Sequence, residues 1–179
     1  MRLFIIGYMA SGKTTFGKAL SSRLNAPFID LDEYIEGKTG KTISEIFAEK
    51  GEEGFRQLEK DLLIKATTEN ENIIMACGGG TPCHFDNMEF LNKNGITVFL
   101  ETSADVLVER LQSENDKRPL VAGKSDDEIR QKVLTQLCQR LPDYMQAKLK
   151  WHGDDLNSLS EIEENVESFV SSYPSIFNF

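Results

Sequence analysis

A glycine-rich segment near the N-terminus has the residue types and spacing of a phosphate-binding loop. It reads GYMASGKTT, residues 7–15, and fits G-x-x-x-x-G-K-[ST] through Gly7, Gly12, Lys13 and Thr14. Glycines let successive backbone N–H groups turn toward one anion, and a helix beginning at about Gly12 points its positive end at the same place. Lys13 can reach the β- and γ-phosphates of a nucleotide, and the Thr14 hydroxyl can coordinate Mg²⁺. An incidental glycine-rich turn is the alternative, but the apolar run LFII directly before the motif favours the phosphate loop.

Two aspartates in the segment PFIDLD could complete such a site. Residues two apart in an extended chain point to the same side, so Asp30 and Asp32 can both face the phosphates. One could hold Mg²⁺, directly or through water, and the other could accept or orient the proton of a substrate hydroxyl. An acidic helix start with Asp32 as N-cap explains the pair equally well. We favour Asp30 over Glu101, another acid at an expected strand end, as the metal partner.

Three consecutive glycines, Gly78 to Gly80, follow the apolar run NIIMAC. Ordering three glycines costs more conformational entropy than ordering other residues. A single tight turn before Pro82 does not need three of them. We therefore expect a ligand to approach bare backbone N–H groups at this point, with the tight turn as the alternative.

Two arginines have the surroundings of carboxylate-binding groups. Arg56 lies in GFRQLE, where Glu59 could orient its guanidinium, and Arg140 lies in RLPDY near a helix end. A guanidinium can pair with a carboxylate through two parallel hydrogen bonds. For either arginine alone, a solvated salt bridge is the competing explanation.

The polar segment from Ser113 to Glu128 contains Lys117, Arg118 and Gly123. It has the character of a mobile flap that carries a cation. In phosphoryl transfer such a cation neutralises charge on the transferred group while closure expels water. An ordinary surface loop is the alternative.

The composition limits the possible classes of protein. The chain has 179 residues, 40% of them hydrophobic, which suits one domain with a sizeable core. A net charge of −9 argues against a general nucleic-acid or membrane-surface binder, and no apolar run approaches 18 residues. Three cysteines without a C-x-x-C pattern predict reduced thiols in a cytoplasmic protein. The spacing of Cys77, Cys83 and His84 does not suit structural zinc.

Apolar strand-like runs alternate with amphipathic segments along the chain. Strands are expected at residues 3–7, 27–32, 72–77, 96–101 and 149–152. Helices are expected after Gly12, over 53–68 and 103–111, and after the capping boxes that begin at Thr42, Ser125 and Ser158. Gly51 should interrupt the helix that starts at Thr42. This alternation predicts an α/β fold with a parallel sheet covered on both faces, and ligands collect at the carboxyl ends of such strands.

In combination these motifs resemble the shikimate kinase family. GYMASGKTT, FIDLD, GFRQLE, CGGG, KRPL and RLPDY occur in the family's order, over about residues 3–144. The resemblance implies a three-layer P-loop kinase fold with a five-stranded parallel sheet in a single domain, residues 1–179. It also implies a helical substrate-binding region at about 31–62 and a mobile lid at about 112–125. The implied reaction is phosphorylation of the 3-hydroxyl of shikimate by ATP with Mg²⁺, in aromatic amino-acid biosynthesis.

The resemblance also assigns roles to individual residues. It makes Asp32 the proposed base, places Asp30 near the Mg²⁺ shell with Thr14, and assigns Arg56 and Arg140 to the shikimate carboxylate. The remaining assignments are substrate contacts by Gly79 and Gly80, phosphate contacts by Ala10, Ser11, Gly12, Lys13, Thr14, Thr15 and Arg118, and packing of Arg110 on adenine. We count Asp32, Lys13 and Arg118 as catalytic. We expect a cytoplasmic monomer whose partners are shikimate and ATP, without nucleic acid or membrane.

The chain departs from the family pattern after Tyr144, in MQAKLKWHGDDLN, so no residue beyond Trp151 is assigned. Trp151 itself is expected to pack in the core or at its rim. The main rival is another small-molecule P-loop kinase, such as a gluconate kinase or a nucleoside monophosphate kinase. A GTP-driven switch would need N-K-x-D, and residues 92–95 read NKNG without the aspartate.

Overall fold

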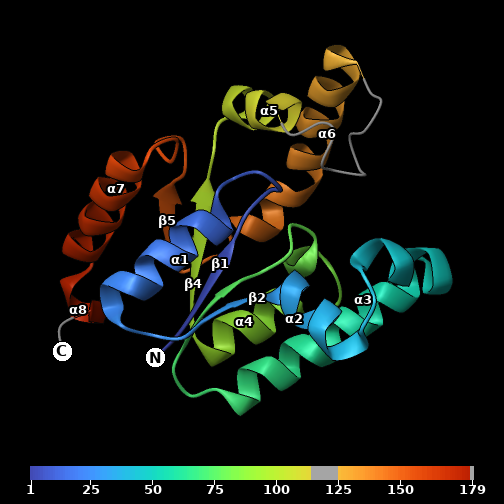
Figure 1. Ribbon diagram of the computed structural model, residues 1–179, viewed down its shortest axis with the longest axis horizontal. Coiled ribbons are helices and arrows are strands. Elements are labelled where there is room, and N and C mark those ends of the chain that lie inside the picture. The colour runs from blue at the N-terminus through green and yellow to red at the C-terminus, as the bar shows by residue number, and fades with distance from the viewer. Residues whose placement is uncertain (114–124, 178–179) are drawn as a thin grey trace.

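The computed structural model describes residues 1–113 and 125–177. Its strands form one five-stranded sheet in the order β2-β3-β1-β4-β5, and every neighbouring pair is parallel (Figure 1). The strands are β1 (Arg2–Ile6), β2 (Phe28–Asp30), β3 (Ile73–Ala76), β4 (Ile96–Glu101) and β5 (Leu149–His152). The predicted five-stranded parallel sheet is therefore confirmed.

The central strand β1 contributes side chains to two separate cores because successive residues of a strand point to opposite faces. Leu3 and Ile5 pack into one hydrophobic cluster, and Phe4 and Ile6 pack into the other. All four side chains are fully buried. Such a strand reads as a continuous apolar run, which is why LFII predicts a strand covered on both sides.

Helices cover both faces of the sheet (Figure 1). On one side, α1 (Lys13–Leu24), α7 (Leu159–Ser172) and α8 (Pro174–Phe177) bury Phe16, Phe169 and Phe177 against the sheet. The other side holds α2 (Leu31–Thr39), α3 (Ile43–Glu69), α4 (Asn87–Asn94), α5 (Ala104–Ser113) and α6 (Asp126–Tyr144), and the short 3₁₀ helix η1 spans Thr81–Cys83. The predicted three-layer arrangement is confirmed.

The three predicted capping boxes are present at the starts of α3, α6 and α7. The interruption expected at Gly51 is a bend inside α3, where this residue has φ 69° and ψ −177°. The two expected helices are therefore one bent helix. The rings of Phe47 and Phe55 stack across the bend with centroids 4.3 Å apart, so aromatic packing holds the two halves together.

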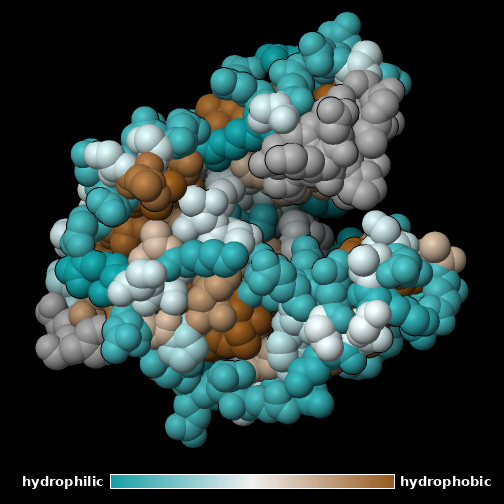
Figure 2. All heavy atoms as spheres, in the orientation of Figure 1, coloured by the Kyte–Doolittle hydropathy of each residue, from teal (hydrophilic) through white to brown (hydrophobic). Residues whose placement is uncertain are grey.

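The carboxyl ends of the strands meet along one rim of the sheet. Ala76 at the end of β3 pairs with Ile5 of β1 and with Asp30 of β2, so the loops that follow these three strands start at similar heights. This register places residues 7–12, Asp30 and the glycines after β3 side by side. The face in Figure 2 is mostly hydrophilic and is hollowed between the part with α5 and α6 and the part with α2 and α3.

The predicted lid, residues 112–125, and its Arg118 lie largely or wholly outside the described residues. Within residues 1–113 and 125–177, no helix has both the length and the apolar character needed to cross a membrane.

Candidate active site

A cavity of about 420 Å³ lies over the phosphate loop at the carboxyl rim of the sheet. Its lining consists of Met9, Ala10, Gly12, Lys13, Thr14, Thr15, Asp30, Asp32, Cys77, Gly78, Gly79, Arg110, Leu156 and Asn157. The cavity thus joins segments from both ends of the chain around the loop that the sequence assigns to phosphate.

The loop between β1 and α1 has the shape that its glycines permit. Gly12 is the N-cap of α1 and has φ 93°, a conformation that side chains rarely adopt. A Cβ atom there would lie 2.6 Å from Cδ1 of Leu156. The N-terminus of α1 therefore opens directly into the cavity, where its N–H groups and dipole favour an anion.

Ser11 differs from its neighbours in the loop. Its side chain is fully buried, and its hydroxyl has no hydrogen-bond partner among the described residues. Its backbone carbonyl accepts a hydrogen bond from the Thr102 hydroxyl at 3.2 Å. Ser11 is not among the residues that line the cavity, so its contact with phosphate stays a prediction.

Lys13 and Thr14, the first two residues of α1, place a cation and a hydroxyl at the cavity. The Lys13 ammonium donates a hydrogen bond to the backbone carbonyl of Tyr8 at 2.7 Å, across the loop. The Thr14 hydroxyl donates to Oδ2 of Asp30 at 2.7 Å. Their side chains thus lie at the mouth of the anion site.

Asp30 is also the N-cap of α2, so the alternative in which Asp32 caps that helix is wrong. The Asp30 carboxylate accepts hydrogen bonds from the backbone N–H groups of Asp32 at 3.0 Å and Glu33 at 3.4 Å. Asp32 is therefore in the first turn of α2 and not in an extended segment. Both carboxylates line the cavity as predicted. They do so because Asp30 caps α2 and Asp32 lies in its first turn, and not because side chains two apart in a strand point the same way.

The Asp32 carboxyl lies in an environment that opposes its ionisation. Burial, and then the nearby carboxylates of Asp30 and Glu59, raise its pKa to about 6 against smaller opposing effects of Lys13 and Arg56. A carboxyl with a pKa near neutrality can both accept and release a proton under ordinary conditions, as a general base must.

A second cavity of about 250 Å³ adjoins the first and shares Met9, Asp32, Gly78 and Gly79 with it. Its remaining lining residues are Ile43, Phe47, Phe55, Arg56, Glu59, Gly80 and Arg140. Asp32 and the glycines after β3 therefore form the wall between a site for phosphate and a site with two arginines.

Arg56 is held rigidly at this second cavity. Its Nη1 donates to Oε2 of Glu59 at 2.7 Å, the orienting partner that the sequence indicates, and the structure adds that Glu59 is itself buried. Gly80 lets the guanidinium approach, because a Cβ atom there would lie 2.5 Å from Nη2. The buried Nε of Arg56 has no hydrogen-bond partner among the described residues, so this edge has an unmet need for an acceptor.

Arg140 approaches the same cavity from the last turns of α6. Its guanidinium lies 5.5 Å from the centre of the Tyr8 ring, and a Cβ atom at Gly79 would be 3.4 Å from its Nη1. In the part of the chain that the structure describes, no carboxylate forms an ion pair with Arg140. Arg56 and Arg140 thus converge on one cavity, as predicted for a carboxylate clamp.

Arg110 lines the first cavity, where the resemblance places an adenine contact, but its guanidinium also links two loops. It donates to the carbonyls of Ala10, Gly153 and Asp154 at 3.3, 3.0 and 2.8 Å, and to Oδ1 of Asn157 at 3.1 Å. The structure thus adds a scaffolding role that the sequence did not suggest.

Several lining residues were not predicted. Leu156 and Asn157 belong to the loop after β5, and the strand-end rule could have identified them because β5 ends at the same rim. Phe47 and Phe55 carry no sequence signal that separates them from ordinary core residues. Trp151 packs on Phe169 with ring centroids 5.3 Å apart, which confirms its expected role in packing.

Comparison with known proteins agrees with this geometry. The family model for shikimate kinase matches residues 9–171. A shikimate kinase of Bacteroides thetaiotaomicron is 47% identical over 167 residues, covering 93% of this chain and 95% of that protein. A crystal structure of shikimate kinase from the same organism superposes with a TM-score of 0.94 at 45% identity, covering 97% of this chain and 98% of the other.

A second solved structure, shikimate kinase from Acinetobacter baumannii in complex with shikimate, has a TM-score of 0.84 at 31% identity. It covers 97% of this chain and 93% of the other. The chain therefore belongs to the shikimate kinase family of phosphotransferases.

Proposed function

We propose that this protein transfers the γ-phosphoryl group of ATP to the 3-hydroxyl of shikimate, giving shikimate 3-phosphate and ADP in aromatic amino-acid biosynthesis. One observation carries the proposal: the phosphate cavity and the arginine cavity share a wall that contains Asp32. A nucleotide in the first and an anionic polyol in the second would meet at this carboxyl. The Acinetobacter baumannii relative crystallised with shikimate supports the choice of acceptor.

The nucleotide's phosphates would bind to the loop N–H groups at residues 10–15 and to Lys13. Thr14 and Asp30 offer a hydroxyl and a carboxylate 2.7 Å apart, the hard oxygen donors that suit Mg²⁺ bound together with phosphate oxygens. When bound, Mg²⁺ would neutralise negative charge on the nucleotide. Arg110 would contact the adenine side.

Arg56 and Arg140 would bind the shikimate carboxylate. The unpartnered Nε of Arg56 and the guanidinium of Arg140 supply N–H donors on one cavity. Gly79 and Gly80 would let the ring approach bare backbone. Binding of the carboxylate at one end of shikimate orients the hydroxyls toward Asp32. The entropy of bringing the reacting groups together is then lost when the substrate binds and not in the chemical step.

Asp32 would accept the proton of the 3-hydroxyl as that oxygen bonds to the γ-phosphorus and the bond to the ADP oxygen breaks. Lys13 would stabilise charge on the transferred group, together with Arg118 of the predicted lid. We further propose that residues 1–179 act as a single-domain monomer in the cytoplasm, with residues 31–62 as the acceptor-binding region and residues 112–125 as the lid.

A comparison of substrates tests the proposal. ADP formation would be measured with ATP and equal concentrations of shikimate, gluconate, AMP or CMP. Of the four acceptors, we expect only shikimate to support ADP formation. Faster turnover with gluconate would favour the rival small-molecule kinase, since two arginines by themselves bind any anionic polyol.

The activity should depend on pH through Asp32. With a pKa of about 6, the carboxyl is about half ionised at pH 6 and about nine-tenths ionised at pH 7. Because only the ionised form accepts a proton, kcat/KM for shikimate should fall about tenfold per pH unit below pH 6. A profile from pH 4.5 to 8.5 at saturating ATP would measure this. Bound nucleotide adds negative charge, so a midpoint somewhat above 6 is consistent, whereas a flat profile down to pH 5 contradicts the role.

Replacing Arg140 by alanine should raise KM for shikimate about 30- to 1000-fold, because a charged contact is lost at a partly desolvated site. KM for ATP should change less than about threefold. Arg130→Ala is the matched control, since Arg130 is on the same helix and pairs with exposed Asp105 at 2.6 Å. An unchanged KM for shikimate in Arg140→Ala would contradict the carboxylate clamp.

A further inference from the structure

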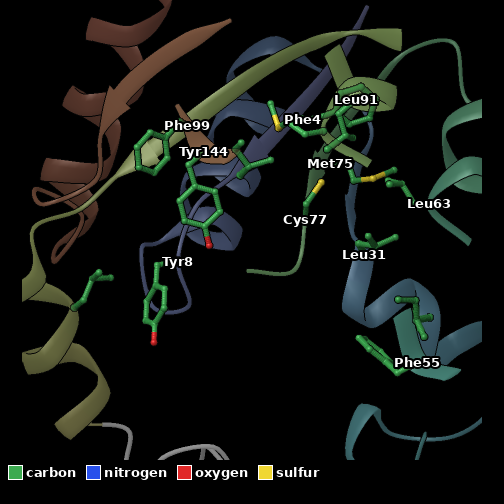
Figure 3. Packing of buried hydrophobic residues seen from close by; sticks show 14 of the residues in the cluster. Phe4, Tyr8, Leu31, Phe55, Leu63, Met75, Cys77, Leu91, Phe99 and Tyr144 are labelled. Atoms are coloured by element: carbon green, nitrogen blue, oxygen red, sulfur yellow. The ribbon is translucent and has the colours of Figure 1, made fainter. Parts of the chain in front are cut away.

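Tyr144 is a fully buried tyrosine at the last position of α6, four residues after Arg140. Its ring packs against Phe99 of β4, with centroids 5.2 Å apart. Figure 3 shows the two rings side by side, with the Tyr144 hydroxyl pointing away from Phe99. The packing holds the ring in place, and the hydroxyl is the part of this side chain that contacts the glycines after β3.

The Tyr144 hydroxyl donates a hydrogen bond of 2.5 Å to the backbone carbonyl of Gly79. A carbonyl can only accept, so the direction of this bond is certain. Burial raises the pKa of the phenol far above neutrality, so the proton that makes the bond is retained. Gly79 belongs to the wall shared by the two cavities. The hydroxyl therefore contacts the backbone of the site directly.

The guanidinium of Arg140 lies close enough to the same hydroxyl to lower the pKa of the phenol, against the larger effect of burial. A guanidinium has only N–H donors, so a hydrogen bond between them runs from Arg140 to the phenol oxygen. The phenol oxygen retains lone pairs for such a bond while its proton is donated to Gly79. One buried hydroxyl thus lies between two groups that the proposed function assigns to the substrate.

The contact with Gly79 has a consequence for the next residue. A peptide unit is planar, and the peptide bonds of the described part of the chain are trans, so the Gly79 carbonyl and the Gly80 N–H point in opposite directions. Fixing the carbonyl fixes the N–H. A peptide between two glycines would otherwise rotate easily, because neither residue has a Cβ atom to restrict it.

We propose that Tyr144 is a positioning residue for the acceptor: its hydroxyl holds the Gly79–Gly80 peptide and the Arg140 guanidinium in one arrangement before the substrate binds. The proposal rests on the proposed function, in which these two groups contact shikimate. The competing explanation is that the hydrogen bond only stabilises the fold. In that case its removal would change stability without changing how substrate binds.

The test compares Tyr144→Phe with Tyr173→Phe. The first variant keeps the ring on Phe99 and removes only the hydroxyl. Tyr173 is the matched control, because its hydroxyl also donates to a backbone carbonyl, that of Lys150 at 3.4 Å, and the residue packs against the core cluster on the opposite face of the sheet. KM for shikimate, KM for ATP and kcat would be measured for both variants and for the unmodified protein.

We expect Tyr144→Phe to raise KM for shikimate about 5- to 30-fold, the equivalent of one lost hydrogen bond, with KM for ATP changed less than about twofold. Tyr173→Phe should leave both values unchanged. Equal effects of the two variants, or a parallel rise of both KM values in Tyr144→Phe, would overturn the proposal. If the unmodified protein does not phosphorylate shikimate, it is the proposed function that fails, and the two failures are thus distinguishable.

A double-mutant cycle tests the link to Arg140. Arg140→Lys keeps the charge but lacks the planar fork. In that background Tyr144→Phe should raise KM for shikimate clearly less than it does in the unmodified protein, because part of what the hydroxyl positions is already lost. Equal factors in both backgrounds would overturn the coupling.

A second variant covers the case in which Tyr144→Phe does not fold. Phe99→Leu keeps the hydroxyl but loosens the ring that carries it. KM for shikimate should then rise about threefold, since small displacements of positioned groups weaken binding. An unchanged KM would overturn the proposal.

Discussion

Asp32→Asn is expected to lower kcat about 10²- to 10⁴-fold while leaving ATP affinity nearly unchanged, because the amide cannot accept the proton of the acceptor hydroxyl. The substitution keeps the size and most of the hydrogen-bonding capacity of the side chain, so the cavity wall should retain its shape. Steady-state kinetics and calorimetric titration with ADP would separate the two effects. Equal losses of turnover and of nucleotide affinity would remove the assigned role.

The same substitution should stabilise the protein. The pKa of Asp32 rises from its ordinary value of 3.8 to about 6 on folding, first because the group is buried and then because Asp30 and Glu59 lie nearby. The folded state therefore holds the proton more tightly than the unfolded chain does. Folding is favoured by this group at low pH, and that advantage is lost as the pH rises from about 4 to about 6.

At pH 7.5 asparagine should thus raise the free energy of unfolding by about 1–3 kcal/mol, while at pH 4 the gain should be less than about 1 kcal/mol. Urea unfolding of both proteins at the two pH values would measure the difference. Asp61→Asn is the control, because Asp61 is an exposed carboxylate that accepts a hydrogen bond from Gln57 at 3.0 Å. If the increase in the free energy of unfolding is the same at both pH values, the surroundings do not raise the pKa of the Asp32 carboxyl.

Lys13→Ala is expected to reduce turnover by about 10³-fold or more, since it removes the loop cation that would face the transferred phosphoryl group. In the structure the ammonium donates to the Tyr8 carbonyl at 2.7 Å, which places the cation at the end of the loop. Nucleotide affinity should fall as well, because the β-phosphate loses the same partner. Single-turnover measurements would separate the loss of binding from the loss of chemistry.

The loss of Lys13 should also move the pH profile of any remaining activity. Lys13 lowers the pKa of Asp32, so its removal should shift the acidic limb toward higher pH. Lys18→Ala is the matched control on the same helix, because Lys18 is exposed and lies 3.8 Å from Glu33. Residual turnover within about tenfold of the unmodified protein would contradict the role of Lys13.

Local features of the fold were predictable because short segments of sequence determine them. The run LFII, buried on both faces, has the composition of a central parallel strand, and the pattern from Gly7 to Thr14 defines the phosphate loop. Capping boxes at Thr42, Ser125 and Ser158 depend on residues three apart, so they appear as predicted. Such signals need no knowledge of the rest of the chain.

For the Asp30–Asp32 pair, the sequence predicts the correct location of both carboxylates but the wrong local backbone conformation. Both carboxylates line the phosphate cavity, as the sequence indicates. The capping bonds of Asp30 start α2 at Leu31, two residues earlier than the extended pattern through Asp32 suggests. A strand end and a helix start share the same polar residues, so the sequence alone does not separate them.

By itself, the sequence determined the sheet, the phosphate loop and the set of charged groups, because periodicity, caps and motif spacing act over a few residues. Only the tertiary structure decided that Arg56, Arg140 and Asp32 surround adjoining cavities, that Arg110 ties the last loop to the first, and that Tyr144 contacts Gly79. These contacts join residues far apart in the chain. Their distances follow from how the helices pack on both faces of the sheet, and no short stretch of sequence contains that information.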